Sequence, residues 1–66
     1  MKKYQITLKN YKVKFTLLFS AKYDINDISA EMIHEKLLKY YRSYVISNKM
    51  QISLLYRKEY IINLIP

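Results

Sequence analysis

The side chains of this sequence that are best suited to chemistry are cations separated by short polar residues. They are Lys3, Lys9, Lys12, Lys14, Lys22, Arg57 and Lys58. Ammonium and guanidinium groups displace the counterions of phosphates, and nearby hydroxyl and amide groups such as those of Gln5, Thr7 and Thr16 donate hydrogen bonds to phosphate oxygens. The set predicts a surface that binds nucleic acid or a ribonucleoprotein.

Lysines on an exposed strand have a second interpretation, because they also keep the strand soluble and prevent it from pairing with another sheet. A surface that serves only solubility usually mixes both charges. Residues 2–22 contain no Asp or Glu, and the chain carries a formal net charge of +7 over 66 residues. This imbalance favours binding over solubility alone.

No group of residues predicts a catalytic site, a metal or a cofactor. Glu31 and Glu35 are one helical turn apart, but they also suit the helix dipole, and Glu35 can pair with Lys39. His34 is the single His, and the chain has no Cys and no Gly. The sequence therefore lacks the residues for a zinc cluster, a cysteine nucleophile or a glycine-rich phosphate loop. We expect His34 to be a solvent-exposed helix residue and the protein not to be an enzyme.

Two strands are predicted in the N-terminal part of the chain, where Lys3, Lys9, Lys12 and Lys14 lie. Apolar and polar residues alternate from Lys3 to Lys9 and from Tyr11 to Ala21, which is typical of a sheet with one apolar and one basic face. We expect the strands to join at Asn10, which tolerates a left-handed backbone in a chain without Gly.

A helix is predicted next, beginning near Asp27 or Ser29, whose side chains can accept hydrogen bonds from its first free amides. Apolar residues then recur at three- and four-residue steps to about Ser43, which places them on the side that faces the sheet. They are Ile28, Met32, Ile33, Leu37, Tyr40, Tyr41 and Tyr44. Tyr40 and Tyr44 are assigned to the core, whereas Tyr41 is either core or part of an aromatic contact with a partner.

The remainder of the chain predicts two more strands. After a turn at residues 47–49, apolar residues alternate from Met50 to Tyr56, and residues 57–59 form the turn of a second hairpin. Tyr60 to Ile65 is the fourth strand, rich in β-branched residues. The expected fold is α+β: one small ββαββ domain over residues 1–66, with one helix packed on the apolar face of an antiparallel sheet.

The fourth strand also predicts a protein interface, because its residues are apolar on both faces and a helix can cover only one of them. The expected interface residues are Leu55, Ile61, Ile65 and Tyr41, and the partner is a second copy of the chain or a host protein. A slip of one residue would exchange Ile61 with Ile62, so the pattern leaves the register open.

The leading hypothesis is a small basic binding protein that contacts nucleic acid through the lysine-rich face of its sheet. The alternative is a protein-binding inhibitor or adaptor, the role that anti-CRISPR proteins have, which occupies a host enzyme through the last strand and the tyrosines. Abundant Lys, Ile, Tyr and Asn match the codons of AT-rich genomes, such as those of many phages and mobile elements. No apolar run suits a signal sequence or a membrane span, and the acids of the helix do not suit anionic lipid, so a cytoplasmic location is expected.

Overall fold

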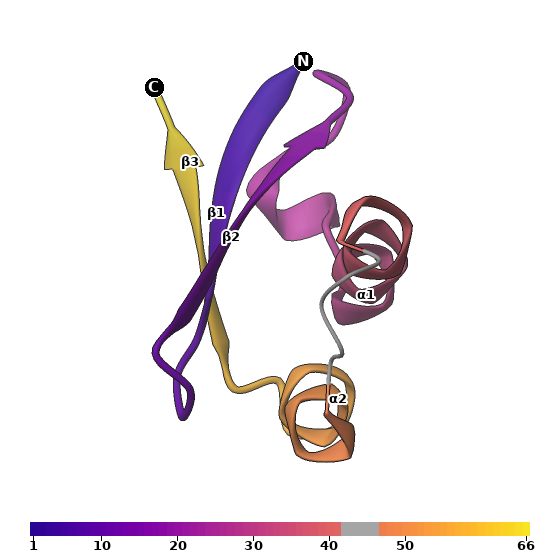
Figure 1. Cartoon of the computed structure of the whole chain (residues 1–66). Coiled ribbons are helices and arrows are strands. Elements are labelled where there is room, and N and C mark those ends of the chain that lie inside the picture. The colour runs from indigo at the N-terminus through magenta and orange to yellow at the C-terminus, as the bar shows by residue number, and fades with distance from the viewer. Residues whose placement is uncertain (42–46) are drawn as a thin grey trace.

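The computed structural model of the chain describes residues 1–41 and 47–66. The elements are the strands β1 (Lys2–Leu8) and β2 (Val13–Phe19), the 3-10 helix η1 (Ile25–Asp27), the helices α1 (Ala30–Tyr40) and α2 (Asn48–Leu55), and the strand β3 (Tyr60–Ile65). The strands form an antiparallel sheet in the order β2-β1-β3, and both α-helices lie on the same side of it (Figure 1). The predicted α+β class is confirmed.

The predicted first hairpin is present as β1 and β2. Tyr4 lies opposite Leu17, and Ile6 lies opposite Phe15, and all four side chains are buried on the side that faces the helices. The loop spans residues 9–12, where the Tyr11 N–H donates to the carbonyl of Leu8 at 3.1 Å. The predicted left-handed backbone at Asn10 is wrong. A four-residue loop reverses the chain without positive φ angles, which only the tightest hairpin loops require.

The core lies between the sheet and the helices. It consists of Tyr4, Ile6, Leu8, Phe15, Leu17, Phe19, Ile28, Ile33, Leu37 and Leu54. Full burial of a side chain such as leucine, isoleucine or phenylalanine contributes about 1.5–3 kcal/mol to the stability of the fold. Six of these core residues belong to β1 and β2. They are on the face of the sheet that the alternation of the sequence predicted to be apolar.

Helix α1 begins where the sequence predicts, since the side chain of Ser29 accepts a hydrogen bond from the Met32 N–H at 3.2 Å. It ends at Tyr40, and the predictions for Ser43 and Tyr44 lie outside the described residues. The assignment of Tyr40 to the core is wrong, because its side chain is 61% exposed. Tyr41, four residues after Leu37, contacts the sheet instead: its ring meets the Phe15 ring edge-on, with centroids 5.2 Å apart.

The predicted third strand is wrong, because residues 48–55 form the helix α2. The side chain of Ser47 accepts a hydrogen bond from the Met50 N–H at 3.2 Å. This bond is the usual cap at the start of a helix and has no equivalent in a strand. Ser53 and Leu54 are buried, whereas Ile52 is exposed, as helical spacing requires. Over only seven residues, the apolar positions fit the two-residue period of a strand as well as the 3.6-residue period of a helix. The serine cap is the feature that identifies the segment as a helix. The arrangement is therefore ββααβ, and ββαββ is overturned.

The predicted fourth strand is confirmed as β3, but it pairs with β1 and not with a strand from residues 50–56. Ile62 lies opposite Ile6, which places Ile62 on the helix side and Ile61 on the outer face of the sheet. Residues 57–59 therefore connect α2 to β3, and the predicted second hairpin is wrong.

Lys58 in this connection has a φ of 54°, the one positive φ among the described residues. A side chain with a Cβ pays roughly 1–2 kcal/mol in this left-handed region. We expect Lys58→Gly to be about 1 kcal/mol more stable than Lys58→Ala, which removes the same charge but keeps the Cβ. Urea unfolding of both variants, followed by circular dichroism, measures this difference. Equal stability would mean that residue 58 does not hold the left-handed conformation in solution.

Candidate functional site

Two loops that are distant in the sequence lie side by side and bring predicted cations together. The Lys9 N–H donates to the carbonyl of Glu59 at 3.1 Å, and the Asn10 side chain donates to the Glu59 carboxylate. The loop between β1 and β2 is thereby fixed against the connection between α2 and β3. Figure 1 shows both at the end of the molecule opposite the labelled termini.

Helix α2 adds a cation that the sequence did not assign to the site. Lys49 lies in the first turn of α2 and, with Tyr11, Ile52, Ser53 and Arg57, lines a shallow hollow of about 250 Å³. The sequence pattern places Lys49 in a turn, because it predicts a strand for the residues that follow. The serine cap at Ser47 is the signal that would have placed Lys49 on a helix.

We call this cluster the basic end of the molecule. It comprises Lys9, Lys12, Lys14, Lys49, Arg57 and Lys58, all of which are exposed. The single acid among these segments is Glu59, whose carboxylate lies 3.9 Å from Arg57 and also accepts from Asn10. These segments therefore carry six cations and one carboxylate, and neighbouring groups already engage that carboxylate.

Two of the predicted cations lie elsewhere. Lys3 lies opposite Leu18 of β2 and Ile65 of β3, at the end of the sheet near the chain termini. Lys22 follows β2, with its ammonium group 5.2 Å from the centroid of the Tyr23 ring. The side chains of Lys3 and Lys22 are therefore separated from the basic end by most of the length of the strands.

The outer face of the sheet is mixed in character and not uniformly basic. A row of Thr16, Gln5 and Asn63 crosses its middle. Apolar side chains lie on both sides of this row, and Leu18 and Ile61 are 48% and 44% exposed. The lysines of this face are at its two ends, so the binding surface expected from the sequence is divided in two.

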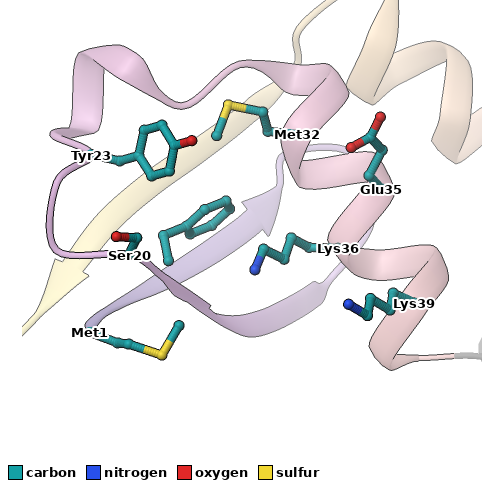
Figure 2. Close-up of a pocket in the computed structure, with 8 residues that line it drawn as sticks. Met1, Ser20, Tyr23, Met32, Glu35, Lys36 and Lys39 are labelled. Carbon is teal, nitrogen blue, oxygen red and sulfur yellow. The ribbon is translucent and has the colours of Figure 1, made fainter.

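A second hollow, of about 340 Å³, lies between the end of β2 and helix α1. Figure 2 shows its lining, in which Lys36 and Lys39 extend from α1 and Glu35 lies on the same helix. The Lys36 ammonium is 5.2 Å from the centroid of the Phe19 ring. Nearby, Lys2 is paired with Asp24 at 3.0 Å. Because this hollow and its surroundings contain both acids and bases, it has a smaller charge excess than the basic end.

The four predicted interface residues do not form one surface. Ile61 and Ile65 are on the outer face of the sheet. Leu55 is on α2, and Tyr41 packs on the helix side, where its hydroxyl donates to the carbonyl of Thr16 at 2.9 Å. The sheet therefore separates Leu55 and Tyr41 from the two isoleucines.

Two of the described side chains have a pKa displaced from its ordinary value. The hydrogen bond to Asp24 raises the pKa of Lys2, and burial together with Glu31 raises the pKa of Tyr60. Both shifts move the titration further from pH 7. The expected exposure of His34 is wrong: the residue is half-buried, and its Nε2 atom is shielded without a hydrogen-bond partner among residues 1–41 and 47–66. No three ligating side chains gather in the described part of the chain as a metal site would require.

Comparison with protein-family models, with curated proteins and with solved structures finds no match to this chain. Neither α1 nor α2 is long and apolar enough to cross a lipid bilayer, and the same holds for every helix in the described ranges.

Proposed function

We propose that this chain is a non-enzymatic binding protein whose basic end contacts the phosphate backbone of a nucleic acid. The observation that carries the proposal is that three separate segments, which together carry six exposed cations and a single carboxylate, meet at one end of the molecule. A surface of this kind attracts a polyanion by releasing its counterions, and it does so without reading the base sequence.

The aromatic side chains near the basic end favour a single-stranded target. Tyr56 directly precedes Arg57, and its side chain is 79% exposed. Tyr11 lines the shallow hollow together with Lys49 and Arg57. Stacking of an unpaired base on such a ring contributes about 1–3 kcal/mol, and in a duplex the bases are not free to stack on it.

The proposal predicts binding that weakens steeply as salt increases. If four to six of the cations each contact one phosphate of a single strand, the slope of log K against log salt concentration is about −3 to −4. Fluorescence anisotropy with labelled single-stranded RNA, single-stranded DNA and duplex DNA, between about 50 and 200 mM salt, measures this slope. Absence of binding to all three at the lowest salt contradicts the proposal and leaves the lysines with a role in solubility.

A protein-binding role is the second candidate, and the outer face of the sheet favours it. Neither α-helix covers this face, on which Leu18 and Ile61 are exposed. As an inhibitor or adaptor, the chain would cover a host enzyme with this face while its basic end steers it toward an acidic surface. A stoichiometric complex that persists in about 0.5 M salt, where exposed ion pairs are screened, supports this candidate over the first.

A further inference from the structure

The two edges of the sheet differ in how their unpaired backbone groups are covered. In an antiparallel pair, successive residues point their N–H and C=O groups alternately toward and away from the partner strand. The hydrogen bond from the Lys9 N–H to the Glu59 carbonyl shows that residue 59 directs its backbone groups toward β1, and every second residue along β3 does the same. It follows that Tyr60, Ile62 and Leu64 direct their backbone groups away from β1, toward the open edge of the sheet.

The corresponding edge of β2 is protected at its middle. By the same alternation its outward groups belong to Lys14, Thr16 and Leu18. The hydroxyl of Tyr41 occupies the Thr16 carbonyl at 2.9 Å, and the Lys14 side chain adds a charge of the kind that prevents strands from pairing. A strand approaching this edge would have to displace the Tyr41 hydroxyl from the Thr16 carbonyl and lie beside the charge of Lys14.

The edge of β3 has neither form of protection, although the 3-10 helix η1 lies close to this strand. Residues 60–65 include no charged residue and no Pro. No side chain or loop of the described residues bonds to the outward backbone groups of β3. Leu64 belongs to the side of the strand that faces the helices, yet it is 54% exposed. An uncharged strand with open backbone groups and exposed apolar side chains is a template for another strand.

We infer that the partner of this edge is the β3 strand of a second copy of the chain, which joins the two sheets into one. In an antiparallel register centred on Ile62, each Tyr60 lies opposite the partner's Leu64, on the same side of the sheet. This register satisfies the outward groups of all three residues in both copies. The strand is thus complementary to itself, as a two-fold interface requires.

Charge also favours this arrangement over other contacts between two copies. Each chain carries +7, so the repulsion between two copies is weakest where they meet at strands without charged residues. In the antiparallel register, Arg57 and Lys58 at the start of one β3 lie beside the end of the other. The two basic ends are therefore at opposite corners of the joined sheet and remain accessible.

A substitution at the open edge tests the inference. Leu64→Lys places a charge beside the partner's Tyr60 in both halves of the interface, and Leu18→Lys is a matched control because it adds the same charge at a similarly exposed leucine on the protected edge. We expect sedimentation equilibrium to give wild type and Leu18→Lys the mass of a dimer of the 8.1 kDa chain, and Leu64→Lys at least a tenfold weaker association.

A second variant separates loss of pairing from loss of folding. Leu64→Pro removes only an N–H that points away from β1, so the monomer keeps its ladder while the dimer loses a bond in each half. Circular dichroism verifies that each variant is folded. A wild type that stays monomeric at about 1 mM overturns the inference, as does a Leu18→Lys variant that dissociates as readily as Leu64→Lys.

Discussion

Replacement of Leu37 by Ala is expected to leave much of the protein unfolded at 25 °C. Leu37 is fully buried near the end of α1, between that helix and the sheet. Truncation of a buried leucine to alanine costs about 2–5 kcal/mol, because the transfer free energy is lost and a cavity remains. A core in a chain of 66 residues rarely supplies more than about 3–5 kcal/mol of net stability, and this chain has no disulfide to add to it.

The neighbouring leucine is the matched control. Leu38 is the next residue of the same helix, and its side chain is 50% exposed. Leu38→Ala therefore removes the same atoms but is expected to change the free energy of unfolding by less than about 1 kcal/mol. Urea unfolding monitored by circular dichroism compares the two variants. A similar loss in both would mean that α1 does not present the Leu37 side to the sheet.

Neutralising three cations of the basic end is expected to produce the largest change in nucleic-acid binding. The triple variant Lys9→Gln, Lys12→Gln and Lys49→Gln lowers the formal net charge from +7 to +4. All three side chains are exposed, and none takes part in an ion pair with another described residue. The variant should therefore fold normally, which circular dichroism can verify before binding is measured.

The expected effect follows from counterion release. Each phosphate contact on a single strand contributes about −0.7 to the slope of log K against log salt concentration, so loss of three contacts reduces its magnitude by about 2. At about 0.1 M salt the same loss weakens binding on the order of 10²-fold. An unchanged slope with weaker binding would point to loss of stacking or of structure, and not to loss of phosphate contacts.

The local sequence pattern predicted those strands and helix ends for which the residues fit only one kind of secondary structure. The alternation in residues 3–9 and the β-branched residues in 60–65 identified strands that the structure contains, and Ser29 marked the start of α1. Residues 50–56 failed because their apolar positions fit a strand and a helix equally well over so short a segment. Tyr40 and Tyr41 are adjacent, and only packing against Phe15 decides which one faces the sheet.

The candidate site depended on contacts between distant residues, which no local pattern contains. Lys9 and Lys58 were both predicted to bind, but their proximity follows from the pairing of β3 with β1, and no local pattern predicted which strands are neighbours. Lys3 lies near the start of β1, and Lys9 directly follows its end, so the two lysines are at opposite ends of the sheet. Lys49 was missed for a local reason, since its helix was interpreted as a strand.

The most direct test of the basic end compares two variants of equal charge. The control variant carries Lys3→Gln, Lys22→Gln and Lys39→Gln, which are exposed residues near the opposite end of the molecule. Like the basic-end variant it has a formal net charge of +4, and at about 0.1 M salt charges more than about 10 Å from a phosphate are largely screened. Anisotropy titrations of both variants with one labelled single strand should show a loss on the order of 10²-fold for the basic-end variant and less than about fivefold for the control. Equal losses in the two variants would show that net charge, and not the convergence of cations at the basic end, determines binding.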